Sequence, residues 1–141
     1  MEAHQLPSGT YLEQNKYYIE RVLGDGGFGI TYLGYDVKLQ RKVAIKEFYM
    51  RGYCYRNPGD PNVYTEAGEK RENFEKMKRQ YIEEGRVLAA LGEQPGVVNV
   101  YTFIEENNTA YLVMDFVEGQ SLDAYAVSYT HLRAHETLAN L

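Results

Sequence analysis

The chain has 141 residues, of which 44% are hydrophobic and 25% are charged, and its formal net charge is -5 at pH 7. This size and composition suit one globular domain and exclude disordered, collagen-like and disulfide-rich proteins. The negative charge provides no field that would attract nucleic acid or anionic lipid, so neither is expected as a partner.

Cys54 is the only cysteine, so neither an intrachain disulfide nor a four-thiolate zinc site can form. The N-terminus lacks a basic start followed by an apolar core, and no apolar run approaches the ~18 residues of a membrane span. We therefore expect a cytoplasmic segment without membrane contact, while a longer parent chain could be anchored elsewhere.

Residues 1–16 form an N-terminal extension, in which His4 has no partner nearby in sequence and is expected to be solvated. Segments rich in β-branched and aromatic residues follow at 17–24, 28–36 and 41–48, and they predict an antiparallel meander. Residues 50–68 are rich in Pro, Gly and Asn, which predicts a loop or insertion at the surface.

Across residues 69–91, apolar side chains recur at helical spacing and predict a long amphipathic helix, which Gly92 and Pro95 end. Glu84 interrupts the apolar stripe, so its carboxylate is expected to face the core and to require a cation. The alternative is that Glu84 lies at the edge of the stripe in solvent, with Glu83 as its equal.

Two more strands are predicted at 97–106 and 109–117, joined at Asn107-Asn108, because Asn tolerates the positive φ of a hairpin turn. The expected fold class is α+β, with a five-stranded antiparallel sheet and one long helix.

A glycine-rich motif of the form G-x-G-x-x-G lies between the first two predicted strands of the meander. A dinucleotide-binding fold would need this motif to open a helix, so that fold is excluded. Between strands, the glycines let backbone amides approach phosphate oxygens, although an ordinary flexible hairpin is the alternative. The motif consists of Gly24, Asp25, Gly26, Gly27, Phe28 and Gly29.

The segment Val43-Ala44-Ile45-Lys46 places a lysine within an apolar strand, with Ala44 and Lys46 on one face. A small residue beside a flat ring and a lysine near phosphates would suit a nucleotide pocket, with Glu84 holding the ammonium group. The alternative is an edge-strand lysine that discourages aggregation.

Residues 23–46 resemble the ATP-binding signature of protein kinases, and the segment YIEEGRVLAAL resembles the helix that carries the glutamate partner of the lysine. TAYLVMDFVEGQSLDAY is similar to the fifth strand, the hinge and the next helix of that family, and GGFGITYLG with VAIKEF is most similar to bacterial serine/threonine kinases. The resemblance implies a kinase N-terminal lobe over residues 17–126, including the 50–68 insertion, with the C-terminal lobe absent.

This resemblance implies that Lys46 contacts the α and β phosphates of ATP and that Glu84 orients Lys46, which makes these two the catalytic residues. The glycine-rich motif would cover the phosphates, and Met114 would be the gatekeeper. Asp115 and Val117 would be the hinge residues that bond adenine through their backbones. Further nucleotide contacts are implied for Leu23, Thr31, Ala44, Val98 and Ser121.

Phosphoryl transfer in this family takes its catalytic base and its Mg²⁺ ligands from the motifs H-R-D-x-x-x-x-N and D-F-G, and neither occurs in this sequence. We expect the full-length parent to transfer the γ-phosphoryl group of ATP to protein hydroxyls, and this chain alone to be inactive. The alternative function is a non-catalytic module, either pseudokinase-like or an interaction domain.

Residues 127–141 begin with VSYTHLRAHET, which resembles the in-frame translation of a transposase sequencing adapter. We expect the native sequence to end near Ala126 and the remainder to be a non-native tail. His131 and His135 have helical spacing but no third ligand, so no metal site is expected.

Overall fold

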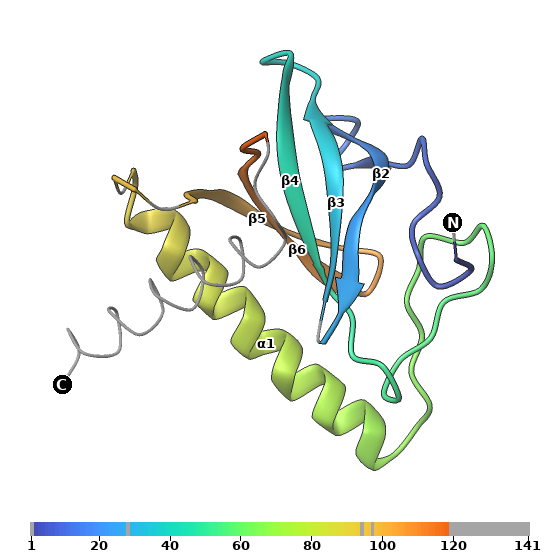
Figure 1. Cartoon of the computed structure of the whole chain (residues 1–141). Coiled ribbons are helices and arrows are strands. Elements are labelled where there is room, and N and C mark those ends of the chain that lie inside the picture. Colours follow the sequence, from blue (N-terminus) through green and yellow to red (C-terminus); the bar gives the residue numbers. More distant parts are fainter. Residues whose placement is uncertain (1, 28, 94, 97, 119–141) are drawn as a thin grey trace, which may run out of the picture.

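The structure is a computed structural model, and it describes residues 2–27, 29–93, 95–96 and 98–118. These residues form one antiparallel sheet in the order β1-β2-β3-β4-β6-β5, together with one helix (Figure 1). The elements are β1 (Tyr11–Leu12), β2 (Tyr17–Gly26), β3 (Gly29–Asp36), β4 (Arg41–Phe48), α1 (Glu69–Ala90), β5 (Val100–Glu106) and β6 (Thr109–Asp115).

The α+β class, the meander and the long helix are confirmed, but the sheet has six strands where five were expected. The additional strand is β1, which pairs Tyr11 with Tyr18 and Leu12 with Tyr17. Two residues are too few to show the alternation of apolar and polar side chains by which a strand is recognised. Sequence patterns therefore cannot reveal β1.

Local backbone conformations follow the expectations from the sequence. Asn107 and Asn108 both have φ of 59° and form the tight turn between β5 and β6. Helix α1 ends at Ala90, and Gly92 follows with φ of 71°. The hairpin turn and the end of the helix are thus both formed by residues that tolerate a left-handed backbone.

Helix α1 packs against one face of the sheet (Figure 1). Leu88 of the helix belongs to one buried cluster with Ala44, Leu112 and Met114 of the central strands. A Cβ atom at Gly85 would overlap Cδ2 of Leu112 and would lie 3.4 Å from Cβ of Phe103. The absence of a side chain at Gly85 therefore lets the helix approach the sheet closely.

The opposite face is covered by the N-terminal segment (residues 2–10) and by the insertion (residues 50–68), which lie side by side in Figure 1. Leu6 and Val63, each 1% exposed, share a buried cluster with Ile45. The expectation of a surface loop at 50–68 was therefore wrong in part, because Val63 belongs to the core. The physical reason is that a sheet with two apolar faces must have both covered.

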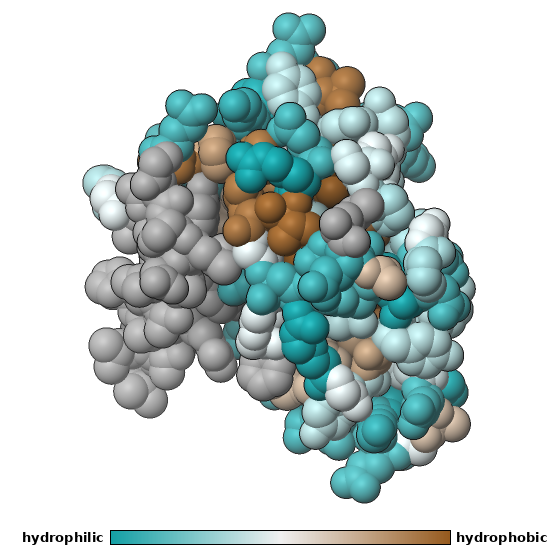
Figure 2. All heavy atoms as spheres, turned by 45° about the vertical axis from the view of Figure 1, so that its right-hand side comes forward, coloured by the Kyte–Doolittle hydropathy of each residue, from teal (hydrophilic) through white to brown (hydrophobic). Residues whose placement is uncertain are grey.

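Polar side chains dominate the lower part of the surface shown in Figure 2, and hydrophobic ones gather in its upper middle. Val37 and Leu39, at the turn between β3 and β4, are 43% and 58% exposed.

Among the described residues, no helix is long and apolar enough to cross a membrane.

Candidate functional site

Lys46 lies near the middle of the sheet, on β4, where it pairs with Thr31 of β3 and Leu112 of β6. Ala44, two residues earlier, pairs with Leu33 and Met114. Residues paired across antiparallel strands, and residues two apart on one strand, point to the same face. Thr31, Ala44, Lys46 and Met114 therefore share the face that α1 covers.

The apolar residues of the expected adenine pocket are brought together in part. Ala44, Val98 and Met114 belong to one buried cluster, as expected of adjoining apolar walls. Leu23 is half-buried on β2, and Val117 is 40% exposed. Ser121 lies outside the described residues, so its predicted contact with ribose stays a prediction.

The glycine-rich turn (residues 24–29) comprises the last three residues of β2, the connection to β3 and the first residue of β3, so the motif lies between two strands as the sequence predicted. Gly27 has φ of 62°, which a residue with a side chain rarely adopts. Phe28 lies outside the described residues. A Cβ atom at Gly29 would lie 3.2 Å from Cε of Lys46 and 3.0 Å from the carbonyl oxygen of Glu47. The turn thus ends directly against the lysine side chain, which a larger residue at position 29 would displace.

Helix α1 also contacts the part of β4 that carries Lys46. The hydroxyl of Tyr81 donates a hydrogen bond to the carbonyl oxygen of Lys46, at 2.8 Å. Gly85 lies against Leu112, the β6 neighbour of Lys46. Glu84 lies between these two contacts, three residues after Tyr81, so it faces the same side of the helix. The helix therefore places Glu84 beside the part of β4 that carries Lys46.

The two candidate glutamates differ in their surroundings. The side chain of Glu83 is 63% exposed and accepts a hydrogen bond from Arg86 at 3.0 Å, whereas Glu84 is half-buried. Burial lowers the pKa of Lys46, because desolvation disfavours the charged ammonium group. A cation in such surroundings is stabilised by anionic groups, which favours Glu84 over Glu83 as its neighbour and suits phosphate as its ligand.

At the end of β6, Asp115 is held by the segment that leads into β5. Its Oδ2 atom accepts hydrogen bonds from the backbone N–H of Asn99 at 3.0 Å and from Nδ2 of Asn99 at 3.1 Å, and Oδ1 contacts the hydroxyl of Tyr101. Its backbone N–H donates to the carbonyl of Asn99 at 3.0 Å. In any backbone hydrogen bond between Asp115 and adenine, the carbonyl oxygen of Asp115 would therefore be the acceptor.

The expectation that His4 is solvated was wrong. Its side chain is 19% exposed, and Nε2 lies 2.6 Å from Oδ2 of Asp25 in the glycine-rich turn. Burial and the nearby Arg51 guanidinium lower the pKa of His4. The contact joins residues that are 21 positions apart, and no short-range pattern in the sequence reports such a contact.

Sequence reasoning also missed a buried ion pair behind the site. Arg56 of the insertion donates two hydrogen bonds to Glu47, from Nη1 to Oε1 at 2.9 Å and from Nη2 to Oε2 at 2.6 Å, and both side chains are 0% exposed. Glu47 also accepts a hydrogen bond from the hydroxyl of Tyr32 at 2.8 Å. The sequence does contain a signal for this pair. Glu47 follows Lys46 on an apolar strand, so its carboxylate must face the opposite side of the sheet, where burial requires a cation as its partner.

The described residues include no group of three or more His, Cys, Asp or Glu side chains that could hold a metal ion. Cys54 is half-buried and donates to the carbonyl of Met50 at 3.3 Å, and burial raises the pKa of its thiol to about 11. At neutral pH this thiol is protonated and is a poor nucleophile or ligand.

Comparisons with known proteins agree with this geometry. The model of the protein kinase domain family matches residues 17–140. The chain is 37% identical over 107 residues to serine/threonine-protein kinase pkn2 of Myxococcus xanthus, covering 76% of this chain and 10% of that protein. It is 36% identical over 107 residues to serine/threonine-protein kinase PknD of Chlamydia pneumoniae, covering 76% of this chain and 9% of that protein.

Among solved structures, the chain is similar to the one named PpkA-294 apo form, with a TM-score of 0.75 and 35% identity over 85% of this chain and 41% of that chain. The fold is therefore that of a kinase N-terminal lobe. The chain spans about a tenth of the length of the two relatives named above.

Proposed function

The chain belongs to the protein kinase domain family, and from this premise we propose that residues 17–126 form the ATP-binding part of a bacterial-type serine/threonine protein kinase. Lys46 would contact the α and β phosphates, and Glu84 would orient Lys46. The glycine-rich turn would cover the phosphates with its backbone amides. The parent enzyme would transfer the γ-phosphoryl group of ATP to hydroxyl groups of protein substrates.

One observation carries this proposal: the glycine-rich turn and helix α1 converge on Lys46 from opposite sides. Gly29 adjoins the lysine side chain, and Tyr81 bonds to the lysine backbone. A lysine that only discouraged aggregation would lie on an edge strand, whereas β4 lies between β3 and β6. The convergence is the arrangement that phosphate binding by a lysine and a glycine-rich turn requires.

Thermal unfolding with and without ATP tests the binding. Saturating ATP is expected to raise the melting temperature, because a ligand present at a hundred times its Kd stabilises the folded state by about 2.7 kcal/mol. Lys46→Ala is expected to remove most of this ATP-dependent shift. Lys38→Ala is the matched control, because Lys38 is exposed at the turn between β3 and β4 and should leave the shift unchanged.

No shift with the unchanged chain would contradict nucleotide binding. It would favour the alternative, a non-catalytic interaction module. Retention of the full shift in Lys46→Ala would show that nucleotide binds elsewhere.

We further propose that these 141 residues alone transfer no phosphate. The motifs that supply the catalytic base and the Mg²⁺ ligands in this family do not occur in the sequence. Incubation with radiolabelled ATP, Mg²⁺ and a generic protein substrate is expected to give only background labelling. Labelling above background that Lys46→Ala abolishes would contradict this.

A further inference from the structure

The carboxylate of Asp25, inside the glycine-rich turn, is held by three side chains from outside the sheet. His4 Nε2 lies 2.6 Å from Oδ2, and Gln5 Nε2 donates to the same oxygen at 2.8 Å. The guanidinium group of Arg51 forms an ion pair with Oδ1. As a result the side chain of Asp25 is only 14% exposed, although it belongs to a turn at the end of two strands. The N-terminal segment supplies two of these partners and the insertion supplies the third.

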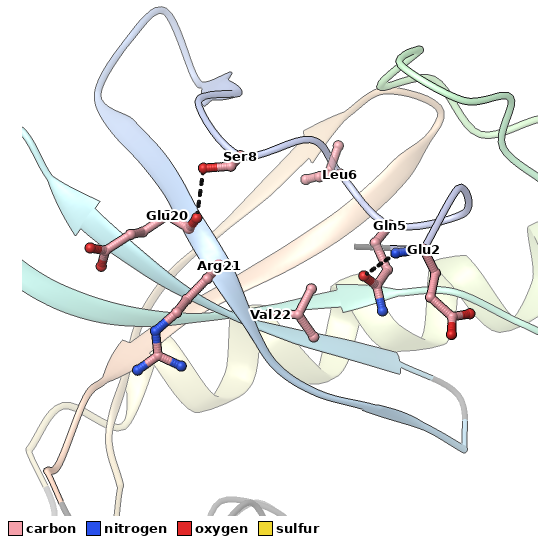
Figure 3. Close-up of a pocket in the computed structure, with 7 residues that line it drawn as sticks. All are labelled: Glu2, Gln5, Leu6, Ser8, Glu20, Arg21 and Val22. Carbon is pink, nitrogen blue, oxygen red and sulfur yellow. Dashed lines mark hydrogen bonds between the residues drawn. The ribbon is translucent and has the colours of Figure 1, made fainter.

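The N-terminal segment is itself fixed to the sheet. The backbone N–H of Leu6 donates to the hydroxyl of Tyr32 at 3.1 Å, and the hydroxyl of Ser8 donates to the carbonyl of Glu20 at 2.8 Å. Figure 3 shows this segment passing over β2, with residues of both lining a pocket. The volume of this pocket is about 380 Å³. The carbonyl of His4 also accepts a hydrogen bond from Arg56, so the chain is anchored on both sides of Gln5 and holds that residue in place where it meets Asp25.

The buried arginine of the insertion connects both structures to the strand that carries the lysine. Arg56 Nη1 donates to the carbonyl of His4 at 3.0 Å, and the same guanidinium group is paired with Glu47, the residue after Lys46. A continuous set of hydrogen bonds therefore runs from Asp25 through His4 and Arg56 to β4. It fixes the glycine-rich turn relative to the residue that would contact phosphate.

The tip of the turn, at Gly26 and Gly27, lies in open space. A Cβ atom at Gly26 or at Gly27 would meet no atom within 4 Å. Glycine also loses more conformational freedom on ordering than any other residue. Apart from the pairing of β2 with β3, the Asp25 side chain is therefore the contact that ties this end of the hairpin to the N-terminal segment and the insertion. The charges are also suitable, because Arg51 offsets the carboxylate, which would otherwise repel a triphosphate nearby.

We infer that Asp25 is a positioning residue for the nucleotide: through His4, Gln5 and Arg51 it holds the glycine-rich turn in place before ATP binds. This inference rests on the proposed function, since it assumes that the turn covers the phosphates. The N-terminal segment and the insertion thereby set the affinity for the triphosphate. Loss of the tether lowers the fraction of molecules whose turn is ready to bind, and affinity falls by the same factor.

The test compares Asp25→Ala and Arg51→Ala with Arg79→Ala. Arg79 is exposed on α1, so its loss matches the change in charge of Arg51→Ala without touching the turn. Two quantities are measured: amide hydrogen exchange of Gly26 and Gly27 without nucleotide, and the Kd values of ATP and of adenosine by calorimetry. Exchange of α1 amides shows whether each variant keeps its fold.

Asp25→Ala is expected to speed exchange in the turn and to weaken ATP binding on the order of tenfold, with adenosine affinity unchanged. Arg51→Ala is expected to do the same to a smaller extent, and Arg79→Ala to change neither quantity. A variant that merely destabilised the fold would weaken adenosine binding too and would speed exchange in α1.

Unchanged exchange in the turn of Asp25→Ala overturns the inference, and so does faster exchange with unchanged ATP affinity. Failure of the unchanged chain to bind ATP contradicts the proposed function instead. The two failures are distinguishable, because exchange is measured without nucleotide.

Discussion

At the scale of single residues, the most consequential interaction outside the candidate site is the pair formed by Arg56 and Glu47. The guanidinium group also donates to the carbonyl of Pro61, from Nε at 3.1 Å and from Nη2 at 2.9 Å, and to that of His4. Hydrogen bonds of this number and geometry offset the cost of removing two charges from water. Loss of one of these hydrogen-bonding groups would leave part of that desolvation cost without compensation.

Arg56→Ala is expected to lower the free energy of unfolding by about 3–5 kcal/mol, because it leaves the Glu47 carboxylate buried without its cation. Arg86→Ala is the matched control. Arg86 is paired with Glu83 at the surface of α1, with side chains 58% and 63% exposed, and its loss is expected to cost no more than about 0.5 kcal/mol. Urea denaturation of the two variants measures both values. Equal effects would show that the buried pair does not stabilise the fold.

At the scale of elements, the position of α1 depends on the missing side chain at Gly85. Gly85→Ala raises intrinsic helix propensity by roughly 1 kcal/mol, but the new methyl group overlaps Leu112 and pushes the helix from the sheet. The net result is expected to be a loss of about 1–3 kcal/mol, as for other overpacked cores. Gln80→Ala and Gln80→Gly, at an exposed position within the helix, together measure propensity alone. A stabilised Gly85→Ala variant would contradict the close approach described here.

The elements themselves could largely be predicted from the sequence, because their signals are local. β4 was predicted with its observed bounds, the helix to within one residue of its end, and the turn at Asn107-Asn108 from two residues alone. What could not be predicted joins distant segments. The contacts of His4 with Asp25 and of Arg56 with Glu47 depend on how the N-terminal segment and the insertion fold back, and no periodicity encodes that.

The candidate site shows the same division. Lys46 and the glycine-rich turn were identified from their motifs, and Glu84 was chosen over Glu83 from the helical stripe. The Tyr81 hydroxyl and Gly85, which bring the helix to Lys46, were not recognised. A hydroxyl that bonds a backbone carbonyl, and a glycine that permits close packing, carry no pattern that distinguishes them from other tyrosines and glycines.

At the scale of the whole molecule, the folding unit is larger than the region that matches the family. That match begins at residue 17, yet Leu6 and Leu12 are 1% and 0% exposed in the main core. Residues before the match therefore contribute apolar burial that a lobe cut at residue 17 would lack.

Leu6→Ala is expected to lower the free energy of unfolding by about 2–5 kcal/mol, as for other buried leucines. Leu39→Ala is the control, because Leu39 is 58% exposed and its loss should change stability by less than about 0.5 kcal/mol. Thermal unfolding followed by circular dichroism compares the two. A Leu6→Ala variant as stable as Leu39→Ala would mean that the N-terminal segment is detached in solution.

The Arg56–Glu47 pair also constrains how this sequence can diverge. A variant that keeps residues 50–68 but loses the arginine would leave a carboxylate buried beneath the sheet, so a change of Arg56 should be accompanied by a change of Glu47 to a neutral residue. Related kinases that keep such a covering insertion should accordingly carry the acid and the arginine together, or lack both.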